Sequence, residues 1–96
     1  MPDELAKIQV LIPSVFARFT GGKHTLVLHA STVGQAIARL VHDFPELQSQ
    51  LTDEQGKLLS YVQLFLNENQ VRDLADLNTP LSDRDELLLV PALAGG

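Results

Sequence analysis

One helical stripe, flanked on both sides by strand-like alternation, constrains the fold of this chain more than any other feature. Between Ser31 and Phe44, apolar residues recur at intervals of three and four, which predicts a helix of about three turns with a single apolar side. Ser31 is expected to accept hydrogen bonds from the first free amides, and Pro45 should stop the helix at Asp43 or Phe44. Because one helix covers only one face of a sheet, the other face should be open to water or to a partner.

Gly34 lies in the first turn of this predicted helix and allows two explanations. Its backbone freedom costs a helix up to about 1 kcal/mol relative to Ala. Alternatively, the missing side chain lets another segment of backbone approach closely. The sequence alone leaves both explanations open.

The segment before the helix reads as a β-hairpin. Apolar residues alternate along residues 8–12, so Ile8, Val10 and Ile12 should face the core. The turn is expected at residues 20–23, whose two glycines tolerate positive φ, and the returning strand at residues 24–28. The stretch between the first strand and the turn has no clear period.

Strand patterns return after the helix. A weak helical piece and a polar loop at residues 52–57 lead to a strand at residues 61–66, whose inward side chains are Val62, Leu64 and Leu66. Residues 67–70 then turn the chain into a short fourth strand. The last strand, at residues 86–90, contains four successive apolar residues and is therefore expected to be central in the sheet.

Alternation along the last strand predicts an apolar patch on the open face of the sheet. Leu87 and Leu89 should lie under the helix, so the residues between and after them point the other way. Such a patch favours a docking surface for a partner, although single exposed apolar residues are common. The residues predicted on this face are Leu11, Phe65, Leu88 and Val90.

Composition excludes several classes of function. The 96 residues suffice for one domain, and seven Lys and Arg against twelve Asp and Glu give a net charge of −5, which argues against nucleic acid as a ligand. There is no cysteine, hence no thiol nucleophile and no zinc–thiolate site. The acidic start is unlike a signal peptide, and no apolar run is long enough for a membrane span, so a cytoplasmic location is expected.

The polar residues show no motif of an active site. The three histidines lack the spacing of a metal-binding helix, and we expect surface or structural roles for them. Asp83, Asp85 and Glu86 lack the spacing of a calcium loop and read as a polar turn. No serine lies in a Gly-x-Ser-x-Gly elbow. We therefore predict no metal site, no bound cofactor and no catalytic side chain.

The end of the chain is the remaining candidate. Pro91 should end the last strand, which predicts one domain at residues 1–90 and a thin, flexible tail at residues 91–96. Gly95 and Gly96 would let the backbone enter a narrow channel of an enzyme, with the Gly96 carboxylate as the reactive group. The alternative is a frayed terminus without a role.

Three segments together resemble the ubiquitin-like sulfur carriers of the MoaD/ThiS type. These are the tail at residues 90–96, the polar segment at residues 80–86 before the last strand, and Phe65-Leu66-Asn67-Glu68. The resemblance runs from about Lys7 to Gly96. It implies a β-grasp (ubiquitin-like) α+β fold, with a mixed four- to five-stranded sheet and one main helix packed on one face.

The resemblance also implies a function as a carrier rather than an enzyme. A ubiquitin-activating-like adenylyltransferase/sulfurtransferase would attach AMP from ATP to the Gly96 carboxylate, and a sulfur donor would then displace AMP to leave a thiocarboxylate. An acceptor enzyme would take the sulfur as the tail enters its active site. Gly95 and Gly96 form the reactive end, and the tail residues expected to contact these partners are Pro91, Ala92, Leu93 and Ala94.

The subtype depends on small departures from the family pattern. Molybdopterin synthase small subunits usually have two prolines before the tail, whereas this chain has Pro91-Ala92. Together with Ile12-Pro13 and residues 19–22, this looks more like carriers for cysteine biosynthesis, whose acceptor is cysteine synthase-like. The alternatives are a small subunit that serves a molybdopterin synthase large subunit, a carrier for thiamine or tRNA thiolation, a ubiquitin-like protein modifier, and an interaction module that is never activated.

Overall fold

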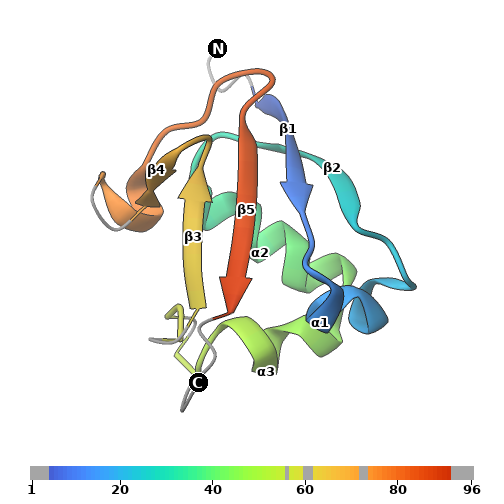
Figure 1. The fold of residues 1–96 in the computed structure, drawn as a ribbon. Helices are drawn as coiled ribbons and strands as arrows, with labels where there is room; N and C mark the ends of the chain where they lie inside the picture. The colour runs from blue at the N-terminus through green and yellow to red at the C-terminus, as the bar shows by residue number, and fades with distance from the viewer. Residues whose placement is uncertain (1–4, 56, 60–61, 72–73, 92–96) are drawn as a thin grey trace.

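The computed structural model describes residues 5–55, 57–59, 62–71 and 74–91, and this part of the chain forms a mixed five-stranded sheet. The strands lie in the order β2-β1-β5-β3-β4 (Figure 1). β1 and β5 pair in parallel, and the other neighbours are antiparallel. The strands are β1 (Ala6–Leu11), β2 (Thr25–Ala30), β3 (Val62–Leu66), β4 (Asn69–Gln70) and β5 (Glu86–Pro91). The predicted central position of the last strand is confirmed.

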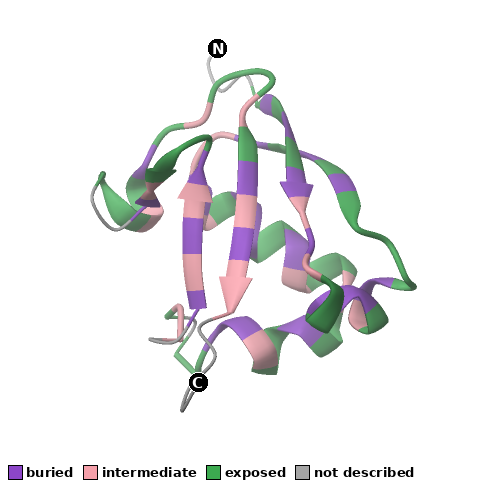
Figure 2. Cartoon of the chain, viewed as in Figure 1, coloured by how far each residue is buried: buried purple, intermediate pink, exposed green. Residues whose placement is uncertain are grey.

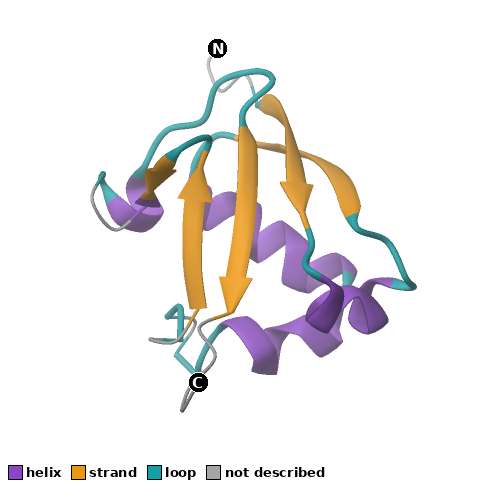
Figure 3. Ribbon diagram, viewed as in Figure 1, coloured by secondary structure: helices purple, strands orange, loops and turns teal. Residues whose placement is uncertain are grey.

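One main helix, α2 (Val33–Asp43), packs behind the sheet, and the opposite face is open (Figure 3). Two short helices, α1 (Ser14–Ala17) and α3 (Gln48–Leu51), lie near one end of the strands. Three-residue 3₁₀ helices flank them, and another follows β4 at Asp76–Asn78. This arrangement confirms the predicted α+β class with one main helix. No helix in the described residues is long and apolar enough to cross a bilayer.

The core lies between α2 and the sheet. Figure 2 shows buried and less buried residues alternating along β5 and β3, as the two-residue period of a strand requires. Leu87 and Leu89 are fully buried, and Val62 and Leu64 face the same side from β3. Ile8, Val10 and Ile12 are also buried, so the faces predicted for these strands are confirmed.

The start of α2 differs by one residue from the prediction. Thr32, not Ser31, is the N-cap, because its Oγ1 accepts a hydrogen bond from the Gln35 N–H at 3.1 Å. The Gln35 side chain in turn accepts from the Ser31 N–H and hydroxyl. The main-chain N–H groups of Ser31 and Gln35 at the start of the helix thus have side-chain acceptors. The helix ends at Asp43, as predicted.

The structure decides between the two explanations for Gly34. A Cβ at this position would lie 3.0 Å from the backbone oxygen of Leu77 and 3.3 Å from the Leu77 Cβ. The close approach of the 3₁₀ turn that contains Leu77 to α2 therefore favours glycine at position 34.

The connection between β1 and β2 is longer and more helical than the predicted turn. α1 and a 3₁₀ helix at Arg18–Thr20 occupy the stretch without a clear period, and the returning strand begins at Thr25. The positive φ angles predicted for the glycines are confirmed, at 71° for Gly21 and 86° for Gly22. Thr20 is buried, and its hydroxyl lies 3.0 Å from the Ala17 carbonyl oxygen and 2.8 Å from that of Lys23, so it donates its single proton to one of them at a time.

Candidate functional site

β5 brings the end of the chain out of the middle of the sheet. It lies between β1 and β3, and its last residue, Pro91, pairs with Val62. Pro91 therefore belongs to the strand, one residue beyond the predicted boundary at residue 90. The predicted tail residues Ala92, Leu93, Ala94, Gly95 and Gly96 lie outside the described residues. Their roles stay predictions.

Three of the four predicted open-face residues form a row across the sheet. Leu88 of β5 lies opposite Leu11 of β1 on one side and opposite Phe65 of β3 on the other. Residues opposite each other in register point to the same face, so their side chains are neighbours. Val90, next along β5 on this face, lies opposite Gln63. The sequence therefore identified a contiguous apolar surface, which we call the open-face row: Leu11, Phe65, Leu88 and Val90.

The open-face row is less exposed than predicted. All four residues are half-buried, because each side chain in the middle of a sheet is shielded by its cross-strand neighbours about 5 Å away. Three neutral amide side chains surround the row, namely Gln9, Gln63 and Gln70. Glu86, two residues before Leu88 on the same face of β5, adds one carboxylate to this rim. An apolar centre with a polar rim is the usual composition of a protein-binding surface.

A hydrogen-bonded clamp fixes the start of β5. The Asn67 side chain accepts from the Glu86 N–H at 3.1 Å and donates to the Asp85 carboxylate at 3.2 Å. Asn67 has a φ of 59°, a left-handed conformation that Asn tolerates better than most residues. The two inner segments behind the sequence resemblance, residues 65–68 and 80–86, are thus one structural unit.

The acidic turn before β5 binds main-chain amides. Asp83 accepts a hydrogen bond from the Lys7 N–H, and Asp85 accepts one from the Ser82 N–H, each at 2.8 Å. The Asp85 backbone oxygen accepts from the Gln9 N–H at 3.0 Å. The prediction of a polar turn is confirmed by these bonds, which hold the turn against β1. In the described part of the chain, no group of three or more His, Cys, Asp or Glu residues is placed to hold a metal ion.

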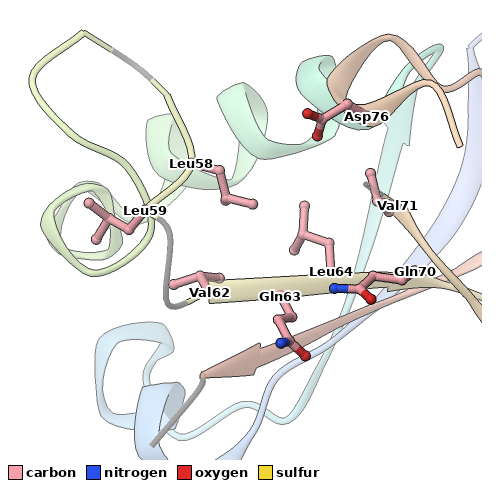
Figure 4. Close-up of a pocket in the computed structure, with 8 residues that line it drawn as sticks. All are labelled: Leu58, Leu59, Val62, Gln63, Leu64, Gln70, Val71 and Asp76. Carbon is pink, nitrogen blue, oxygen red and sulfur yellow. The ribbon is translucent and has the colours of Figure 1, made fainter. Parts of the chain in front are cut away.

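A pocket of about 100 Å³ lies beside β3 (Figure 4). Val62 and Leu64 contribute apolar surface from the strand, and Gln70 and Asp76 add polar groups. Asp76 is the one titratable side chain among the described residues that line it, so these residues supply no acid–base pair of a hydrolytic or proton-transfer site. Sequence reasoning did not predict this pocket, and its chemistry gives no reason to place the function there.

The three histidines lie at exposed positions, as predicted. His24 Nδ1 is 3.3 Å from the Ile12 backbone oxygen, and His42 Nδ1 is 3.4 Å from the Asp43 carboxylate. These contacts join residues of the scaffold and form no catalytic constellation.

The model of the ThiS family matches residues 10–96. This chain belongs to the ThiS family. The sulfur carrier protein CysO of Mycobacterium tuberculosis is 31% identical to it over 91 residues, which are 93% of this chain and 98% of that protein.

Solved structures agree with this assignment to the ThiS family. Small archaeal modifier protein 1 of Methanosarcina acetivorans matches with a TM-score of 0.85 and 25% identity, over 98% of this chain and 100% of that one. A chain of the Amycolatopsis orientalis BexX/CysO complex matches with a TM-score of 0.84 and 28% identity, over 93% and 99%. The predicted resemblance to MoaD/ThiS-type carriers and the predicted β-grasp fold are confirmed, and a sulfur carrier role is supported.

Besides the pocket beside β3, sequence reasoning missed two features of this ThiS-family chain. The first is the clamp around Asn67, for which an Asn after a strand is a weak signal. The second is a hollow on the open face lined by Lys7, Val27 and Arg84, which no local pattern indicates because these residues are distant in sequence.

Proposed function

We propose that this chain carries sulfur as a thiocarboxylate on the Gly96 carboxyl group, as a substrate of other enzymes and not as a catalyst. The observation that carries the proposal is the family match, which extends through residue 96 and includes Gly95 and Gly96. The similarity to CysO over nearly the whole chain supports it further. β5, which leads out of the middle of the sheet at Pro91, suits a protein that presents its end to partners.

In the proposed cycle, an oxygen of the Gly96 carboxylate attacks the α-phosphorus of ATP in an activating enzyme, and pyrophosphate leaves. A sulfide or an equivalent sulfur nucleophile then attacks the acyl carbon, which forms a C–S bond as AMP leaves with the C–O bond electrons. The acyl adenylate is needed because a free carboxylate is a poor electrophile. The chain contributes a tethered carboxyl group at high local concentration, while the catalytic groups belong to its partners.

The short length of the tail is the reason to propose the open-face row as the docking surface for partner enzymes. Residues 92–96 span at most about 18 Å when fully extended. The catalytic site of a partner must therefore lie within that distance of Pro91, which requires the partner to dock next to the end of β5. Leu88 and Val90 lie on β5 itself, so we assign the docking of the activating and acceptor enzymes to the open-face row.

For the acceptor, we propose a cysteine synthase-like enzyme, because the curated relative is CysO and the chain has Pro91-Ala92 where molybdopterin synthase small subunits usually have two prolines. A second candidate function is protein modification, because the chain is also similar to small archaeal modifier protein 1. In that case the activated Gly96 would form an amide with a lysine of another protein.

A transfer experiment tests these proposals together. The carrier is charged with its activating enzyme, ATP and sulfide. It is then offered, in separate reactions, a cysteine synthase-like enzyme with a serine derivative that carries a leaving group on its β-carbon, or a molybdopterin synthase large subunit with its pterin substrate. In the first reaction the sulfur displaces that leaving group, and hydrolysis of the resulting acyl bond frees the cysteine. We expect the carrier to lose its sulfur only to the first, with cysteine as the product. Loss only to the second would overturn the cysteine assignment. A carrier that receives no sulfur but forms amide conjugates with lysines would favour the modifier function.

A further inference from the structure

β2 has an outer edge that no strand covers in the described part of the chain. The sheet order places β2 first, next to β1 alone. The Ile12 N–H donates to the His24 carbonyl at 2.8 Å, and in an antiparallel ladder such hydrogen-bonded pairs alternate. Thr25, Val27 and His29 therefore direct their N–H and C=O groups away from β1. None of these backbone groups has a hydrogen-bond partner among the described residues.

The edge also lacks the usual protection against another strand. Natural edge strands are commonly short, or they carry a charge, a proline or a bulge that prevents further pairing. The six residues of β2 include no proline and no Lys, Arg, Asp or Glu, and the ladder with β1 is continuous over all six. The Val27 side chain is 52% exposed. The outer edge of β2 is therefore a template on which an extended chain can add as a further strand.

Two cations, Lys7 of β1 and Arg84 before β5, line a hollow of the open face that reaches Val27 of β2. Lys7, Gln9, Val27, Arg84 and Glu86 line one hollow, and the register places Gln9 opposite Val27. The Arg84 N–H donates to the Lys7 carbonyl at 2.9 Å, which holds the two basic residues next to each other. In the described residues neither of them has a carboxylate within 4.0 Å. Against these two cations the hollow holds one described carboxylate, that of Glu86, so its described lining is net positive in a chain of net charge −5.

We propose that the outer edge of β2 binds an extended acidic segment of a partner protein as an added strand, with its carboxylates over Lys7 and Arg84. Main-chain hydrogen bonds to Thr25, Val27 and His29 would supply affinity, and the cations would select acidic side chains. A second copy of the chain fits less well, because β2 carries no carboxylate to offer and two bodies of net charge −5 repel each other.

This site goes beyond the proposed sulfur transfer and is separate from it. β1 lies between β2 and β5, so a segment on the outer edge of β2 leaves Leu88 and Pro91 accessible. A protein bound at β2 can therefore stay bound while an enzyme acts on the Gly96 carboxyl group of the carrier.

Nuclear magnetic resonance of the full chain tests the proposal without any activating enzyme. The probe is a capped peptide that alternates Glu and Val over six residues, and the matched probes carry Lys in place of Glu, or N-methyl groups on alternate amides. We expect the acidic peptide to shift the amide signals of Thr25, Val27 and His29. N-methylation should weaken binding about tenfold or more, because it removes main-chain donors. The Lys peptide should bind more weakly than the acidic peptide, and added salt should weaken the binding of the acidic peptide.

Charge-reversal variants test the role of the hollow. Lys7→Glu and Arg84→Glu should each lower the affinity for the acidic peptide about threefold to tenfold, whereas Lys57→Glu, the same change at an exposed site outside the hollow, should leave it nearly unchanged. Equal effects of the three variants would overturn the assignment. So would shifts centred on Leu88, equal binding of the Lys peptide, or self-association through β2. Because the readout does not involve Gly96, failure here leaves the sulfur carrier proposal standing, and the reverse also holds.

Discussion

At the scale of single residues, Gly34 shows how a packing requirement overrides local preference. A glycine inside a helix costs up to about 1 kcal/mol relative to Ala, so propensity alone would favour replacement. The backbone oxygen of Leu77, however, lies 3.0 Å from the position that a Cβ would take. A contact this close to backbone cannot be relieved by rotating a side chain. It holds the segment between β4 and β5 against α2.

Gly34→Ala should therefore lower the free energy of unfolding by about 1–3 kcal/mol, because the added methyl group pushes the Leu77 backbone away. Urea denaturation measures this change. Ala38→Gly is the matched control, since Ala38 is an exposed residue of the same helix. This change should lower the free energy of unfolding by the difference in helix propensity alone, about 1 kcal/mol. Stabilisation by Gly34→Ala would contradict the close approach.

At the scale of elements, the periodic segments were predictable and the aperiodic ones were not. Alternation predicted the inward faces of β1, β3 and β5, and the spacing of apolar residues predicted α2. A four-residue helix such as α1 is too short to show a period, so its segment had no clear prediction. The parallel pairing of β1 with β5 and the clamp at Asn67 join distant parts of the sequence, and no local pattern encodes such contacts.

The Asn67 clamp leads to a prediction about the hairpin of β3 and β4. Asn67→Ala should destabilise the fold by about 1–3 kcal/mol, because it removes the bonds to Asp85 and Glu86. It also places in the left-handed region a residue that lacks the polar side chain by which Asn tolerates this φ. Asn67→Gly should lower the free energy of unfolding by less, since glycine adopts this φ freely. Thermal or urea unfolding compares the two. Equal losses would show that the backbone conformation at Asn67 contributes nothing.

In the molecule as a whole, the two faces of the sheet have different roles. The face under α2 supplies stability through fully buried side chains such as Leu87 and Leu89. The opposite face carries the half-buried open-face row next to the end of β5. The sequence predicted the members of this row because side chains alternate along a strand. It overestimated their exposure, because shielding by cross-strand neighbours depends on register, which a single strand does not reveal.

Leu88→Glu should reduce the rate at which the activating enzyme charges the carrier by about tenfold or more, because it places a carboxylate in the middle of the open-face row. Val27→Glu is the control, since Val27 is an exposed apolar residue on the same face but outside the row. Initial charging rates and urea unfolding are measured for both. Equal charging rates, or complete unfolding of the Leu88 variant alone, would show that Leu88 serves the fold and not docking.

The sulfur on the last carboxyl group can be measured directly by intact mass spectrometry with fragmentation of the terminal peptide. After incubation with the activating enzyme, ATP and sulfide, the chain should gain about 16 Da, the difference between sulfur and oxygen, and the gain should be located on Gly96. A variant that lacks Gly96 should gain nothing while it unfolds at nearly the same temperature, since glycine has no side chain to bury. An unchanged mass, under conditions in which the same enzyme charges an established carrier, would contradict the account.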